Sequence, residues 1–135
     1  MNFIAQIVPR IPVVSLPPKY LSRDQKVVDD YISDPLNYVG KVCSRMGVQL
    51  LRATSLGKTE AANIKLPILI LHGTGDRLSD PKVSKKLYER VASPDKILNY
   101  YEGLYHEIFN EPEQDQIFQD MADWMNSHQE MVAIV

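Results

Sequence analysis

The feature that most constrains the fold is the apolar run from Leu66 to His72, which ends at Gly73 and is followed by Asp76. The run is too short for a free-standing helix and is rich in Ile and Leu. Because it is also bounded by Pro67 and Gly73, it predicts a strand that is buried on both faces. Strands of this kind belong to parallel sheets, and open α/β folds place their ligands just beyond the carboxyl ends of such strands. Asp76 is therefore the first candidate functional residue.

A second strand is expected at 96–101. A helix is expected between the two strands, because Asp80 can cap a helix and Pro81 suits its first position. The order strand, helix, strand predicts a parallel pair whose carboxyl ends share one edge. That edge would carry Asp76 after the first strand and His106 after the second.

The rest of the chain predicts mainly helices. A helix is expected after the possible cap at 22–24, another over about 39–62 with uncertain limits, and a last one from about Glu113. Prolines are expected to hold 13–20 extended as a connector. The apolar residues of 3–11 have helical spacing, and their face either packs on the core or forms a lid or a membrane-facing surface.

Composition indicates one soluble domain. The chain has 135 residues, of which 44% are hydrophobic, and a net charge of -2, which gives no reason to expect a nucleic-acid partner. Its single cysteine, Cys43, is expected to be inert on a helical face and suits a reducing compartment. Neither a signal peptide nor a transmembrane helix is expected, so a cytoplasmic location is predicted. No metal or cofactor is expected, because His72 has no second ligand at metal-binding spacing.

An aspartate and a histidine at one sheet edge can form two members of a relay that activates a nucleophile. The alternative is structural: Asp76 would hold its turn and His106 would cap the next helix. Tyr105, beside His106, is a candidate substrate contact. His72 is expected to be a packed or hydrogen-bonded residue, and two neighbours of the pair are expected to have structural roles, Arg77 in the turn and Glu107 at a helix start.

The sequence motifs around Asp76 and His106 favour the catalytic interpretation over the structural one. Leu-His-Gly-Thr-Gly-Asp-Arg, followed by Tyr-Glu-Gly-Leu-Tyr-His-Glu-Ile-Phe-Asn-Glu-Pro, resembles the carboxyl-terminal third of the α/β-hydrolase superfamily, and within it the monoacylglycerol lipase and lysophospholipase group. In that group the acid stands in a Gly-x-x-Asp turn and the base in a Gly-x-x-His-Glu turn. Gly73 and Asp76 match the first turn, and Gly103 and His106 match the second.

The resemblance implies an α/β fold: a truncated α/β-hydrolase with the last two parallel strands, their helices and much of the helical cap. Residues 1–60 would form the cap region and a connecting helix, and residues 61–135 the carboxyl-terminal part of the core. The chain would be the carboxyl-terminal portion of a serine ester hydrolase that acts on lipid esters, such as monoacylglycerol or lysophospholipid. Asp76 and His106 would be its catalytic acid and base.

The nucleophile is missing from this pattern. The family places its serine in a Gly-x-Ser-x-Gly elbow, and no serine of this chain has glycine two residues to each side. The nearest imitation, Ser55, follows a helical rhythm instead of a buried strand, so a helix-end role is expected for it. The chain alone is therefore predicted to be inactive.

Truncation would leave an open sheet edge, which predicts an amino-terminal half, a partner chain or self-association to cover it. The alternative function is a non-catalytic interaction module. With either function, the chain can also contact a membrane surface peripherally.

Overall fold

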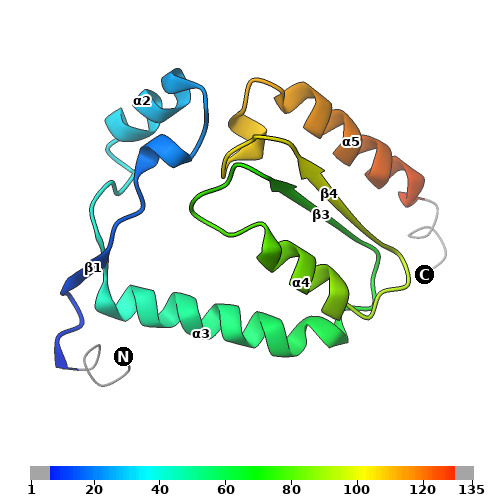
Figure 1. Ribbon diagram of the computed structural model, residues 1–135, viewed down its shortest axis with the longest axis horizontal. Coiled ribbons are helices and arrows are strands. Elements are labelled where there is room, and N and C mark those ends of the chain that lie inside the picture. The colour runs from blue at the N-terminus through cyan, green and yellow to red at the C-terminus, as the bar shows by residue number, and fades with distance from the viewer. Residues whose placement is uncertain (1–6, 130–135) are drawn as a thin grey trace.

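The computed structural model describes residues 7–129 and shows an elongated α/β molecule (Figure 1). Two strand pairs form separate two-stranded sheets. The strands are β1 (Pro12–Val14), β2 (Val42–Cys43), β3 (Ile68–Gly73) and β4 (Lys96–Tyr101). The α-helices are α2 (Gln25–Ser33), α3 (Ser44–Glu60), α4 (Lys82–Arg90) and α5 (Gln114–Ser127), and short 3₁₀ turns lie at η1 (Pro18–Tyr20), η2 (Ala61–Asn63) and η3 (Ile108–Asn110).

The predicted strand-helix-strand unit is confirmed. β3 and β4 are parallel, with Ile68 opposite Lys96 and Gly73 opposite Tyr101, and α4 connects them. Asp80 Oδ1 accepts a hydrogen bond from the backbone N–H of Lys82 at 2.9 Å, which caps α4 as expected. The carboxyl ends of both strands therefore lie at one edge of the sheet.

The small core lies between the β3–β4 sheet and α5. Leu104, Ile108 and Ile117 form a buried cluster, against which Leu71 and Tyr101 pack. The Tyr101 hydroxyl donates a hydrogen bond to Asp120 of α5 at 2.8 Å. Burial, followed by the contact with the Asp120 carboxylate, raises the pKa of Tyr101 to about 12. The last helix thus covers the sheet, as predicted.

The expectation that the first strand is buried on both faces is wrong. Only Ile70 and Gly73 of β3 are buried, and Leu66 just before it is 78% exposed. The described part of the sheet has two strands, and α4 and α5 lie on opposite sides of it (Figure 1). In the described residues β3 has a paired strand on one side only, so its other edge is uncovered and most of its apolar side chains keep partial contact with solvent.

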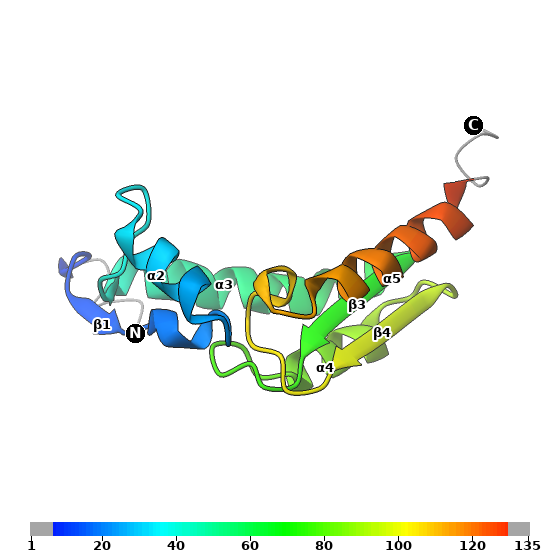
Figure 2. The ribbon, with the colours of Figure 1, turned by 90° about the horizontal axis from the view of Figure 1, so that it is seen from above.

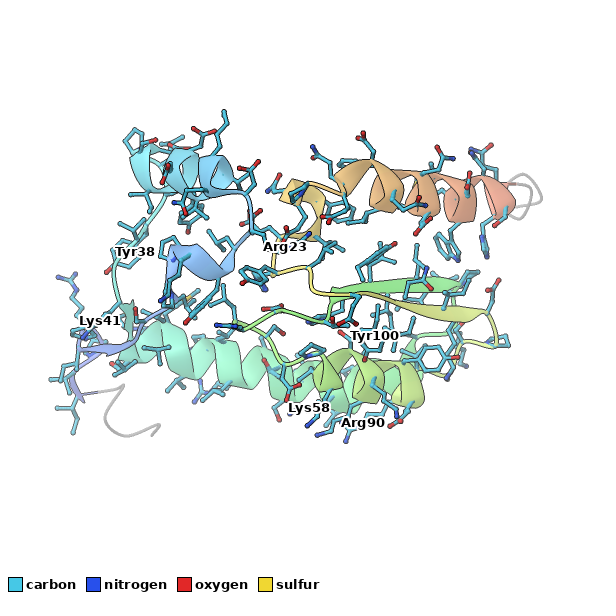
Figure 3. All side chains as sticks on the ribbon, turned by 45° about the horizontal axis from the view of Figure 1, so that its top comes forward. Arg23, Tyr38, Lys41, Lys58, Arg90 and Tyr100 are labelled. Atoms are coloured by element: carbon cyan, nitrogen blue, oxygen red, sulfur yellow. The ribbon has the colours of Figure 1, made fainter. Side chains whose placement is uncertain are left out.

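The long helix α3 extends from beside β1 to beneath α4 (Figures 1 and 2). Figure 3 shows Arg90 of α4 beside Lys58 of α3, and the Arg90 guanidinium donates a hydrogen bond to the Lys58 carbonyl at 3.5 Å. The helix expected over about 39–62 spans Ser44–Glu60 and continues through Gly57. An interior glycine costs a helix only about 1 kcal/mol, which the strong helix formers around it offset.

Three further expectations for the amino-terminal part need correction. The segment 13–20 is not a simple extended connector, since it includes most of strand β1, which pairs antiparallel with β2, and the 3₁₀ turn η1. Cys43 lies in strand β2 before α3 instead of on a helical face. Ser55 lies inside α3 instead of at its end. Pairing between β1 and β2 joins segments about thirty residues apart, and local patterns carry no signal of it.

The apolar segment 3–11 lies partly outside the described residues, which exclude Phe3 and Ile4. Ile7, Val8 and Ile11 are described and exposed. Within residues 7–129, no helix combines the length and the apolar character needed to span a bilayer.

Candidate active site

Asp76 and His106 meet at the shared edge of β3 and β4. Asp76 Oδ2 lies 2.8 Å from His106 Nδ1, although the two residues are thirty positions apart in the sequence. The loops that carry them are joined by backbone hydrogen bonds, from Thr74 N–H to the Tyr101 carbonyl and from Gly75 N–H to the Leu104 carbonyl, both at 2.9 Å. The parallel register of β3 and β4 therefore brings Asp76 next to His106.

The Asp76 carboxylate is buried, with the residue 8% exposed, and both of its oxygens have hydrogen-bond partners. Its Oδ1 accepts hydrogen bonds from the backbone N–H groups of Leu78 at 2.7 Å and Ser79 at 3.0 Å. Burial raises the pKa of Asp76, but the hydrogen bonds from His106, Ser79 and Leu78 together outweigh it. The pKa of Asp76 consequently lies below its ordinary value, and the side chain is a carboxylate at neutral pH.

His106 presents its other ring nitrogen to an open pocket. Because Nδ1 donates to Asp76, Nε2 of the neutral ring is an acceptor. Within residues 7–129 Nε2 has no hydrogen-bond partner, and the side chain is 42% exposed. The pocket has a volume of about 470 Å³, and its lining includes His72, Asp76, Ser79, His106, Ile108 and Phe109. This geometry can take a proton from a group placed in the pocket.

His72 is hydrogen-bonded, as predicted, and it also reaches the site. Its Nε2 faces the Ser79 carbonyl and Asp76 Oδ2, both at 3.2 Å, and its Nδ1 lies 2.6 Å from the Ser84 hydroxyl. A ring that donates from Nε2 accepts the Ser84 hydroxyl proton at Nδ1. Both ring nitrogens are thus occupied, which leaves His72 as a neighbour that braces Asp76.

The remaining candidate residues lie around the Asp76–His106 pair or away from it. Glu107 stands directly before η3 and lines the pocket, but its side chain does not cap this turn as expected. Its carboxylate instead accepts a hydrogen bond from the Asn110 side-chain amide at 2.7 Å. Arg77 differs from expectation, because its guanidinium lies over the Tyr20 ring, 5.4 Å from the centroid. Tyr105 is half-buried and is not among the pocket-lining residues, so its contact with substrate stays a prediction. Ser55 is exposed on α3 and does not line the pocket either.

Sequence reasoning missed Glu111, a buried carboxylate behind the His106 loop. Its Oε2 lies 2.9 Å from Nε of Arg23, and its Oε1 accepts the Tyr105 backbone N–H at 2.6 Å. Ser22, also buried, donates its hydroxyl proton to the Asn110 carbonyl at 2.8 Å. The sequence analysis expects residues 22–24 only to cap a helix, and no spacing rule connects them to Glu111.

Within residues 7–129, no group of three or more His, Cys, Asp or Glu side chains is placed to hold a metal ion. The contact between Asp76 and His106 has the geometry that the acid and the base of a nucleophile-activating relay require.

Comparison with known proteins identifies the family to which the chain belongs. The model of the family Hydrolase_4, described as serine aminopeptidase, S33, matches residues 1–113. The chain therefore belongs to this family of α/β-hydrolases, and the truncated α/β-hydrolase fold expected from the sequence is confirmed.

The relatives are mostly lipases. The chain is 39% identical over 125 residues to the monoacylglycerol lipase of Mycolicibacterium smegmatis, an alignment that covers 93% of this chain and 45% of the relative. It is 39% identical over 137 residues to the monoglyceride lipase of Rattus norvegicus, covering 98% of this chain and 43% of that protein. The resemblance to the monoacylglycerol lipase group is thereby confirmed, and the chain spans slightly under half the length of these relatives.

Solved structures give the same result. The crystal structure of the Paleococcus ferrophilus monoacylglycerol lipase superposes with a TM-score of 0.84 at 32% identity, over 95% of this chain and 50% of that one. A soluble variant of the Saccharomyces cerevisiae monoglyceride lipase, solved with a substrate analogue, superposes with a TM-score of 0.77 at 28% identity, over 93% of this chain and 45% of that one.

Proposed function

We propose that this chain is the carboxyl-terminal portion of a serine ester hydrolase that acts on lipid esters, a monoacylglycerol or a lysophospholipid. In this proposal the chain supplies the acid, Asp76, and the base, His106, and the nucleophilic serine comes from residues outside it. The observation that carries the proposal is the 2.8 Å contact between buried Asp76 and His106, whose Nε2 is free to face the pocket. The lipid substrate is suggested by the monoacylglycerol lipases among the relatives.

The chemistry assigned to His106 is proton transfer in both directions. As the serine oxygen bonds to the ester carbonyl carbon, Nε2 takes the hydroxyl proton, and Asp76 stabilises the imidazolium. His106 then gives this proton to the departing alcohol oxygen as the ester C–O bond breaks, which leaves an acyl-serine. Water adds to the acyl carbon with loss of a proton to Nε2, and that proton returns to the serine oxygen as the carboxylic acid leaves. Amides that stabilise the oxyanion would also come from outside this chain.

A chimera tests this proposal. The part of the Mycolicibacterium smegmatis monoacylglycerol lipase that lies before the matched region is joined to this chain, and release of fatty acid from a monoacylglycerol is measured. We expect hydrolysis by the chimera and none by the isolated chain. A His106→Gln chimera should be inactive, whereas a His128→Gln chimera, altered at a histidine outside the pocket, should retain activity. Equal activity in the His106→Gln chimera would refute the assignment.

We further propose that an amino-terminal half, or a partner chain that supplies it, covers the open edge of β3. An apolar hollow of about 570 Å³ lies between β3 and α5, lined by residues that include Pro67, Leu69, Leu71 and Trp124. The Trp124 Nε1–H is buried there without a hydrogen-bond partner in residues 7–129. A covering segment would bury the apolar side chains that line this hollow. Self-association of the isolated chain is the other way to cover it.

The same proposal divides the chain into two regions. Residues 1–60 form the cap region and connecting helix, and residues 61–135 form the carboxyl-terminal part of the hydrolase core. Contact of the cap with a membrane surface and a cytoplasmic location both stay predictions.

A non-catalytic interaction module is the second candidate, favoured by the missing Gly-x-Ser-x-Gly serine and the open face of β3. A chimera that folds cooperatively but releases no fatty acid would favour this candidate.

A further inference from the structure

Glu111 is a charged side chain in an interior position. The residue is 1% exposed, and its side chain has no exposed surface. A buried carboxylate is costly unless its oxygens are paired. Those of Glu111 accept hydrogen bonds from the Tyr105 backbone N–H at 2.6 Å, the Arg23 backbone N–H at 3.3 Å and Arg23 Nε at 2.9 Å. Glu111 therefore joins the His106 loop to the segment 20–23, which is far away in the sequence.

The backbone around His106 is held at three successive residues. The N–H of Tyr105 donates to Glu111, that of His106 to the Tyr20 carbonyl at 3.4 Å, and that of Glu107 to the Leu21 carbonyl at 2.8 Å. Figure 3 shows Arg23 at this junction, between the amino-terminal elements and the loop before α5. The segment 20–23 and Glu111 thus fix the backbone from which the imidazole projects.

We infer that Glu111 is a positioning residue for His106, an inference that rests on the proposed function of His106 as catalytic base. Glu111 does not line the pocket, so it acts through the backbone and not on substrate. The buried charge holds the Tyr105 peptide and Arg23 together, and this orients His106 so that Nδ1 meets Asp76. Imprecise placement of a catalytic group lowers turnover steeply, which makes such a support functionally important.

The test is the tautomer of His106 in the isolated chain of 135 residues, measured by long-range ¹H–¹⁵N correlation NMR. The His106 signals are assigned by their loss in His106→Gln. In the unsubstituted chain we expect a single tautomer with the proton on Nδ1, because Nδ1 donates to Asp76. In Glu111→Gln we expect loss of this preference and a mixture of tautomers, with the amide signals of β3 and β4 retained.

Glu113→Gln is the matched control. The Glu113 carboxylate also pairs with the Arg23 guanidinium, but it is exposed and no hydrogen bond joins it to Tyr105. We expect the His106 signals of this variant to match those of the unsubstituted chain. If Glu111→Gln leaves them unchanged as well, the inference is overturned.

A second variant covers the case in which Glu111→Gln loses the sheet signals. Glu111→Asp keeps the charge for Arg23 but shortens the reach to the Tyr105 amide. A changed His106 tautomer with an intact sheet supports the inference. An unchanged tautomer, or loss of the sheet in this variant too, overturns it and makes Glu111 a general stability residue. The NMR readout does not depend on hydrolysis, so an inactive chimera counts against the proposed function and not against the positioning role.

Discussion

His72 Nε2 lies 3.2 Å from Asp76 Oδ2, the same oxygen that lies 2.8 Å from His106 Nδ1. One buried carboxylate oxygen thus faces two imidazoles, while its other oxygen accepts two backbone N–H groups. Only His106 has a ring nitrogen left to face the pocket. The surroundings of the two histidines therefore leave only His106 with a ring nitrogen that has no hydrogen-bond partner in residues 7–129.

Asp76→Asn should abolish most of the activity of the chimera. An asparagine cannot stabilise the imidazolium and can favour the wrong tautomer, and the analogous change in serine proteases costs about 10⁴-fold in turnover. Asp80→Asn is a matched control, because Asp80 is exposed and caps α4 outside the site. Turnover of monoacylglycerol is the measurement, and a loss of similar size in Asp80→Asn would contradict the assignment.

Acid should destabilise the chain partly through Asp76. Its pKa is lowered in the folded state, so the unfolded state binds more protons once the pH falls towards the ordinary aspartate value near 4. The contribution of Asp76 to stability is present above that pH and is lost as the pH falls through the folded pKa. Urea unfolding at pH 6 and pH 3 should show a smaller difference for Asp76→Asn than for the unsubstituted chain. Identical differences would contradict the prediction.

The end of α5 should respond to pH in the opposite sense. His128 Nδ1 lies 2.6 Å from the Trp124 carbonyl and Nε2 lies 2.8 Å from Asp95 Oδ2, and these two contacts raise the pKa of His128. Its contribution to stability is therefore full below the ordinary pKa near 6.5 and is lost as the pH rises through the folded value. In His128→Gln the decline in melting temperature between pH 5.5 and pH 8 should shrink. An unaltered decline would show that other groups cause it.

Gly73→Ala should disturb the site through the backbone. A Cβ at Gly73 would lie 2.3 Å from the Leu104 carbonyl oxygen, so the two loops that hold Asp76 and His106 would have to separate. Overpacking of this kind costs about 1–3 kcal/mol in the free energy of unfolding. Gly57→Ala is the control, because a Cβ there has no other atom of the described residues within 4 Å beyond its chain neighbours and the backbone of its own helix. Its helical position also favours alanine by about 1 kcal/mol. Urea unfolding of both variants should give shifts of opposite sign.

The sequence by itself determined the strand-helix-strand unit and the candidate pair. Apolar runs bounded by glycine and proline locate β3 and β4, a cap followed by proline locates α4, and parallel strands must end at one edge. Asp76 and His106 then meet because of topology alone. The motifs that resemble the monoacylglycerol lipase group point to the same two residues. They also predict which part of the α/β-hydrolase fold this chain contains.

Only the tertiary structure decided which groups surround the pair. Glu111 looks like an ordinary acidic residue before a helix, yet it is buried against Arg23 and the Tyr105 amide. Ser55 was expected at a helix end, yet α3 continues past it. Local patterns report periodicity and turns, whereas burial of a charge depends on contacts between segments 88 residues apart. Such contacts have no sequence period, so they are set only when the chain has folded.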